Sequence, residues 1–145
     1  MQTFLPYPNF VASAMVLDRQ RLGKQRVEAM QLVNAIEKQK GTTSKVAWAN
    51  HPAALMWTHH IVALQFYHDC IVREWIRRGY NNNMTLYCPA GTHYPWFQPA
   101  WLGDEAVHSS HRSALLFKDP EWYGQFGWTE EPKYDYTWPK DEPLC

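Results

Sequence analysis

The chain has 145 residues, a length that suits one domain with a single hydrophobic core. Apolar residues make up 46% of the chain, which excludes a disordered composition, and aromatic residues reach 15%, enough to leave some rings for a surface that stacks on bases or ligands. The formal net charge is zero, which argues against a simple polyanion-binding tail.

The charges are unevenly distributed along the chain. Residues 1–117 contain 11 Lys or Arg against 7 Asp or Glu, whereas residues 118–145 contain 3 against 7. A basic body followed by an acidic tail can still bind phosphate groups on one face.

Cysteine usage and the N-terminal sequence indicate the compartment. The three cysteines, Cys70, Cys88 and Cys145, form no CxxC motif, so a disulfide scaffold or a cysteine-rich zinc site is not expected. The start, MQTFLPYPNF, has neither a basic segment nor a long apolar run, and no membrane span is readable. We therefore predict a cytoplasmic protein.

The first elements follow from proline and capping residues. Pro6 and Pro8 predict an extended lead-in, because each lacks an N–H and restricts the residue before it. Asn9 or Ser13 is then expected to cap a long helix that runs to about Lys40.

Glycine and proline mark the next boundaries. Gly41 is expected to end the first helix, and Gly23 inside it predicts a bend. After a polar loop, His51 and Pro52 predict the start of a second helix, which should run to Arg78.

The last part of the chain predicts a long loop, a third helix and a tail. Residues 80–102 are rich in Asn, Pro and Gly, which favours a loop. A helix is expected from about Asp104 to the residue before Asp119, with a short turn after it. Together these elements predict an all-α fold, with residues 1–145 forming one domain around a long N-terminal helix and residues 127–145 forming an acidic, aromatic tail.

Four polar residues are expected to share one face of the first helix: Arg21, Lys24, Gln25 and Glu28. The opposite face would carry core residues, namely Leu22, Ala29, Val33 and Ile36. One interpretation is a solvated surface with i,i+4 ion pairs. The other is a carboxylate among phosphate-binding cations, with Arg19 and Arg26 at its flanks, which suits glycosidic bond cleavage because positive charge develops at C1′.

Several sequence blocks in series resemble the pyrimidine-dimer DNA glycosylase (endonuclease V-like) family. The first is RLGKQRVEAMQLV at 21–33, which is similar to the family's signature helix and places the catalytic Glu at Glu28. The others are MQTFLPYPNF at 1–10, NHPAALMW at 50–57, VREWIRRGY at 72–80 and WLGDEAVHSSHRSALLFKDPEWY at 101–123. The resemblance covers about residues 1–126 and does not include the tail.

The resemblance implies a DNA repair glycosylase that also acts as an abasic-site lyase. Such an enzyme removes a damaged pyrimidine, as in a cyclobutane dimer, through a Schiff base between the chain's α-amine and C1′, and Glu28 assists. No metal and no organic cofactor is implied. An α-amine suits this role because its ordinary pKa is ~7.7–8.0, against ~10.4 for lysine.

The sequence departs from the family pattern at two positions. Gln2 follows Met1, so removal of the initiator is not expected and the nucleophile would be the Met1 amine. Lys24, one turn from Glu28, is the alternative nucleophile. Val27 stands where the family has Arg, so a phosphate contact would have to come from Arg21, Lys24 or Arg26.

Two further groups are candidates for DNA contact. His108, His111 and Arg112 fall on one face of the third helix, and the alternative for them is ordinary surface polarity. Trp122 and Tyr123 align with a family segment that contacts DNA near the lesion, and the alternative is that they anchor a turn on the core. No third metal ligand is evident near the histidines, so no metal is expected.

These observations predict a monomeric enzyme that acts on double-stranded DNA with damaged or modified bases and has no membrane partner. The residues expected to position its phosphates are Arg19, Arg21, Lys24, Gln25 and Arg26. Two alternatives stay open. The first is a DNA-binding module without catalysis that recognises modified or mismatched bases, and the second is a glycosylase for another modified base.

Overall fold

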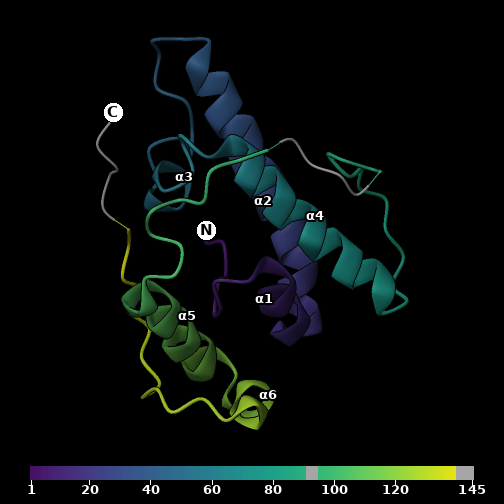
Figure 1. Cartoon of the computed structure of the whole chain (residues 1–145), viewed down its shortest axis with the longest axis vertical. Coiled ribbons are helices and arrows are strands. Elements are labelled where there is room, and N and C mark those ends of the chain that lie inside the picture. The colour runs from purple at the N-terminus through teal and green to yellow at the C-terminus, as the bar shows by residue number, and fades with distance from the viewer. Residues whose placement is uncertain (91–94, 140–145) are drawn as a thin grey trace.

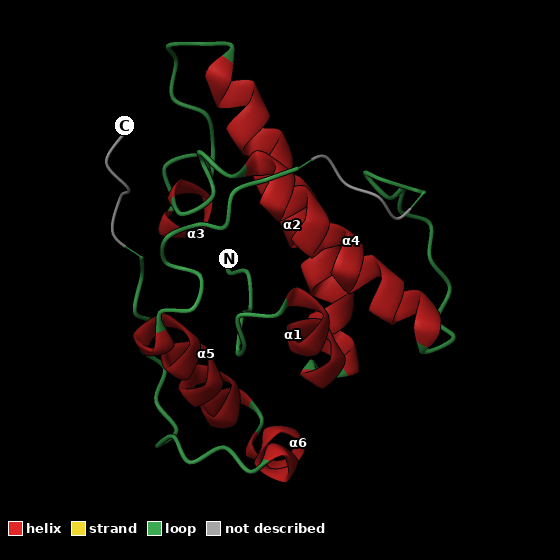
Figure 2. Cartoon of the chain, viewed as in Figure 1, coloured by secondary structure: helices red, strands yellow, loops and turns green. Residues whose placement is uncertain are grey.

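A computed structural model describes residues 1–90 and 95–139 of the chain. These residues form a single all-helical unit in which no strand is present (Figure 2). The predicted all-α fold is therefore confirmed. Its elements, in chain order, are α1 (Phe10–Val16), α2 (Arg19–Lys40), α3 (Pro52–Leu55), α4 (Ile61–Arg77), α5 (Glu105–Lys118), α6 (Pro120–Tyr123) and the 3₁₀ helix η1 (Gly124–Phe126).

The long first helix is broken, and the break is not at the predicted glycine. Asn9 caps α1 as predicted, but the chain leaves the helix at Leu17, and Asp18 caps α2 by accepting from the Arg21 N–H at 3.3 Å. Gly23 lies within α2 without interrupting it. The predicted bend at this glycine is therefore wrong. A Cβ at Gly23 would lie 3.0 Å from Cζ3 of Trp75, so the glycine instead allows α4 to approach α2 closely.

The second predicted helix is also two helices. α3 begins after His51, whose Nδ1 accepts from the Ala53 N–H at 3.0 Å, and turns separate α3 from α4. The described part of the 80–102 loop lacks regular structure beyond turns, as predicted, and residues 91–94 fall outside the described ranges. The third helix is confirmed as α5, while the turn predicted after it is the short helix α6.

The core lies where α2 and α4 pack side by side, with α1 against α4 (Figure 1). Leu22, Ala29, Val33 and Ile36, the predicted apolar face of α2, are all buried. That packing turns the opposite face of α2 toward the N-terminal segment.

Residues 1–9 run between α2 and α5, and hydrogen bonds to both helices fix them there (Figure 1). The Phe4 N–H donates to Oε1 of Gln25 on α2 at 3.0 Å, and the Leu5 N–H donates to Nδ1 of His111 on α5 at 2.9 Å. The first residues of the chain are thereby held beside the polar face of α2. No helix in the described ranges has the length and apolar character needed to cross a bilayer.

Candidate active site

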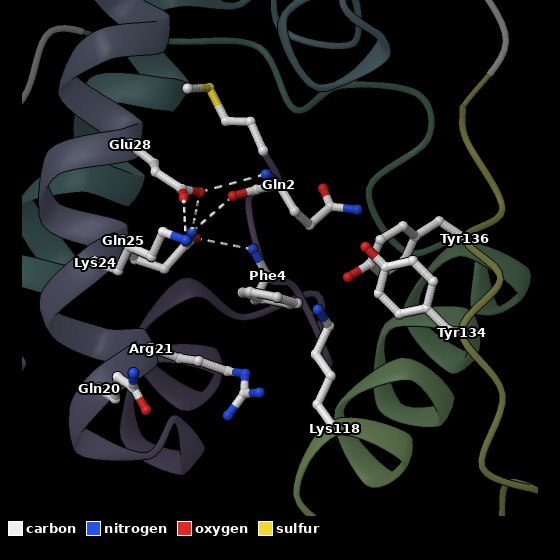
Figure 3. Close-up of a pocket in the computed structure, with 11 residues that line it drawn as sticks. Gln2, Phe4, Gln20, Arg21, Lys24, Gln25, Glu28, Lys118, Tyr134 and Tyr136 are labelled. Atoms are coloured by element: carbon white, nitrogen blue, oxygen red, sulfur yellow. Dashed lines mark hydrogen bonds and ion pairs between the residues drawn. The ribbon is translucent and has the colours of Figure 1, made fainter.

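A pocket of about 280 Å³ lies between the N-terminal segment, the polar face of α2 and the tail (Figure 3). All four residues of the predicted polar stripe line it, together with Met1. The full lining is Met1, Gln2, Phe4, Gln20, Arg21, Lys24, Gln25, Glu28, Lys118, Tyr134 and Tyr136. These side chains face a cavity, and the i,i+4 ion pair of the other interpretation is also present, between Lys24 and Glu28.

Glu28 is the carboxylate of this pocket, and its side chain is 14% exposed. Oε2 accepts from the Gln2 N–H at 3.4 Å and from Nε2 of Gln25 at 3.3 Å. Nζ of Lys24 lies 3.6 Å from Oε1. The carboxylate is thus held at the start of the chain, with one edge still facing the pocket (Figure 3).

Gln25 connects the N-terminal segment to the helix that carries Glu28. Its Nε2 donates to the Gln2 carbonyl at 2.6 Å, and its Oε1 lies 2.6 Å from the Tyr67 hydroxyl. Burial and the negative charge of Glu28 raise the pKa of Tyr67 well above its ordinary value, so the hydroxyl keeps its proton as a donor. Gln25 thus makes its hydrogen bonds within the protein, and its predicted contact with a phosphate stays a prediction.

Covalent geometry places the Met1 amine near Glu28. The Gln2 nitrogen is 3.4 Å from Oε2, and three bonds of about 1.46, 1.52 and 1.33 Å join that nitrogen to the Met1 amine. The amine therefore lies within about 8 Å of the carboxylate.

Three pocket residues come from parts of the chain that the sequence reasoning did not connect with Glu28. Lys118 is the last residue of α5, and its Nζ lies 4.4 Å from the ring centroid of Tyr134. Burial, and then the positive charges of Arg21 and Lys24, lower the pKa of Lys118. Tyr134 and Tyr136 belong to the tail. Their alternate positions in the sequence are the one signal that could have indicated that their rings share a face.

Arg19 and Arg26 point away from this pocket. The guanidinium of Arg19 lies over the Tyr80 ring at 4.7 Å, and that of Arg26 lies over the Trp75 ring at 4.1 Å. Nη1 of Arg26 also donates to Oδ1 of Asn82 at 3.0 Å. Both side chains thus tie α2 to the end of α4 and the loop after it, and Arg21 and Lys24 are the basic residues of α2 that line the pocket.

The two histidines of α5 are buried beside the N-terminal segment. The His108 Nε2 accepts from the Gly103 N–H at 2.9 Å, so its Nδ1 carries the proton and donates to the Leu5 carbonyl at 2.7 Å. His111 accepts from the Leu5 N–H, and burial lowers its pKa to about 3, so the ring is neutral. Arg112 donates to the Pro6 carbonyl at 2.7 Å. This burial favours a role in positioning the N-terminal segment, rather than the predicted contact with DNA.

Trp122 and Tyr123 anchor the end of α5 on the break between α1 and α2. Nε1 of Trp122 donates to the Val16 carbonyl at 2.8 Å, while Trp122 remains 38% exposed. The buried Tyr123 hydroxyl makes a short hydrogen bond to Asp18, the cap of α2. These contacts match the expectation of a turn anchored on the core, and the predicted contact of both residues with DNA stays a prediction.

The described residues do not bring three or more His, Cys, Asp or Glu side chains together in a way that could hold a metal ion. The pocket instead offers one carboxylate, basic side chains and an α-amine. Such a set can form and break a carbon–nitrogen bond by amine attack with carboxylate assistance.

The sequence also matches the model of a known protein family. The sequence model of the family described as pyrimidine dimer DNA glycosylase matches residues 1–87, a segment that includes Met1, Gln25 and Glu28. No curated protein and no solved structure gives a significant match. The chain belongs to the pyrimidine dimer DNA glycosylase family, a family of enzymes that act on damaged DNA.

Proposed function

We propose that this protein is a DNA repair glycosylase with abasic-site lyase activity, which removes damaged pyrimidines such as cyclobutane dimers from double-stranded DNA. The observation that carries the proposal is the placement of the chain's first residues on Glu28, in a pocket also lined by basic side chains. Family membership supports the same class of reaction.

The first step is amine attack on the sugar. The neutral Met1 amine attacks C1′, the bond from C1′ to the base nitrogen breaks, and its electron pair leaves with the base, which takes up a proton. Glu28 stabilises the positive charge that develops on the sugar. The attacking nitrogen then loses a proton, its lone pair forms the C1′=N bond as the C1′–O4′ bond breaks, and O4′ takes up a proton, which leaves a protonated Schiff base between Met1 and C1′.

The second step is strand cleavage. A base removes a proton from C2′, the electrons form a C2′–C3′ double bond, and the C3′–O bond breaks with loss of the 3′ phosphate group. Glu28, which accepts from the Gln2 N–H, suits this proton transfer. Water then hydrolyses the Schiff base and frees the amine.

The Met1 amine is favoured over Lys24 as nucleophile. Lys24 is 74% exposed, and its Nζ lies 3.6 Å from Oε1 of Glu28 in an i,i+4 ion pair. An α-amine ordinarily loses its proton more readily than a lysine. Lys24 then has the role of balancing the charge of Glu28 and approaching a phosphate.

Duplex DNA would contact the pocket through Arg21 and Lys24. Both side chains line the cavity, and cations at this position can hold the phosphates that flank the reacting sugar. Because C1′ is sheltered in stacked duplex DNA, the proposal includes local opening or flipping of a nucleotide.

Borohydride trapping on a duplex with one abasic site tests this function. The wild-type chain is expected to form a covalent adduct, and Glu28→Gln should slow its formation by at least about 100-fold. Glu37→Gln, an exposed change on the same helix, is the control and should behave like wild type. Tight DNA binding without an adduct would favour a non-catalytic binding module, and a panel of lesions would separate dimers from other modified bases.

A further inference from the structure

The tail carries three aromatic residues at alternate positions: Tyr134, Tyr136 and Trp138. Extended backbone places alternate side chains on one face. The Tyr136 ring packs edge-on against Trp138 and Phe4, with centroids 5.6 Å and 6.4 Å away, and the Tyr134 ring lies 5.4 Å from it. The alternation therefore turns a row of rings toward the N-terminal segment.

Polar contacts with α5 fix the tail in this position. The Glu130 carboxylate pairs with Arg112 at 3.0 Å, and it also accepts from the Ser109 hydroxyl at 3.0 Å. The Thr137 N–H donates to the Ser110 hydroxyl at 3.0 Å. Bonds on both sides of Tyr134 hold the backbone, so its ring has a defined place at the pocket.

The pocket has two chemically different walls (Figure 3). The polar wall on α2 carries Glu28 and the cations, and the aromatic wall opposite carries Tyr134 and Tyr136, with Lys118 beside Tyr134. Tyr134 is 60% exposed, although it has several aromatic neighbours. An exposed ring on the wall facing the reactive groups is placed to meet part of a substrate.

We infer that Tyr134, supported by Tyr136 and Lys118, forms a base-binding wall that contacts the nucleobase attached to the reacting sugar. Tyrosine rings bind bases by stacking, because every base has a flat π-face. The wall would thus bind the base while α2 binds the sugar and its phosphates. This inference rests on the proposed function, and it assigns substrate recognition to a part of the chain beyond the matched residues 1–87.

The test uses two ligands that differ by the base alone. Thymidine 5′-monophosphate is compared with 1,2-dideoxyribose 5-phosphate, which keeps the sugar and phosphate but has neither a base nor a reactive aldehyde. NMR titration of the full chain gives both dissociation constants without requiring catalysis. Borohydride trapping separately decides whether the proposed function holds, so the two ideas can fail independently.

Wild type is expected to bind the nucleotide on the order of tenfold more tightly than the base-free ligand. Tyr134→Ala should bring that ratio close to one, while Tyr134→Phe and Tyr134→Trp should keep it because a ring remains. Phe97→Ala removes a ring that is 91% exposed and outside the pocket lining, so it should leave the ratio unchanged. A wild-type ratio near one, or a ratio that Tyr134→Ala does not alter, would overturn the inference.

Discussion

The backbone N–H of Gln2 donates to the Glu28 carboxylate at 3.4 Å, although 26 residues separate the two positions. This contact brings the first residue of the chain to the acidic side chain of α2. It depends on a layer of hydrogen bonds beneath it, from Gln25 on one side and from α5 on the other. The proposed chemistry therefore depends on side chains that position the N-terminal segment as well as on those that react.

Gln25→Ala is predicted to slow adduct formation more than it weakens DNA binding. The change removes the bonds to the Gln2 carbonyl and the Phe4 N–H and leaves buried partners unsatisfied, which costs about 1–3 kcal/mol of folding free energy. We expect single-turnover trapping to be at least about tenfold slower, with a DNA dissociation constant close to wild type. Gln31→Ala, an exposed change on the same helix, is the control. Trapping at the wild-type rate would show that Gln25 does not position the amine.

Arg21→Ala is predicted to reduce the salt dependence of DNA binding. Each phosphate contact contributes a slope of about −0.9 in log K against log salt for duplex DNA, so loss of one contact should lower the slope by about that amount. Arg26→Ala is the comparison, because that guanidinium is held by Trp75 and Asn82. We expect it to lower the melting temperature with little effect on the slope. Equal slopes for Arg21→Ala and wild type would remove Arg21 from the DNA interface.

His111 is predicted to make the fold sensitive to mild acid. Burial lowers its pKa from 6.5 to about 3 in the folded chain. Between these values the unfolded chain binds a proton that the folded chain excludes. The free energy of unfolding should therefore have its full value above about pH 6.5. Below that pH it should fall by up to about 1.4 kcal/mol per pH unit.

The check is a series of urea denaturations between pH 7 and pH 4. His111→Asn keeps an acceptor for the Leu5 N–H but removes the titration, so its stability should fall less steeply with acid. His59→Asn, at an exposed position, should follow wild type. Parallel curves for wild type and His111→Asn would show that His111 does not carry the effect.

Much of the fold could be predicted from local signals. Asn9, Gly41 and Pro52 mark helix boundaries because capping and proline chemistry act within a few residues. The break at Leu17 has a local signal only in Asp18, the residue that caps α2. It is stabilised by Tyr123, which bonds to Asp18 from 105 residues away, and no local pattern encodes that contact.

The candidate site divides in the same way. The polar face of α2 could be predicted, because i, i+3 and i+4 spacing fixes which side chains share a helix face. Lys118 and Tyr134 could not be placed, because they reach the pocket through the path of α5 and the tail. The burial of His108 and His111 could not be predicted either, because it depends on the path of the N-terminal segment.

Peptide mapping of the borohydride-trapped adduct tests the central proposal most directly. The reduced adduct on abasic duplex DNA is digested, and mass spectrometry locates the modified nitrogen. We predict modification of the α-amine of Met1, in wild type and in Lys24→Arg, with no adduct after selective acetylation of that amine. An adduct on Lys24 or Lys118 with an unmodified N-terminus, or the absence of any adduct, would contradict the account.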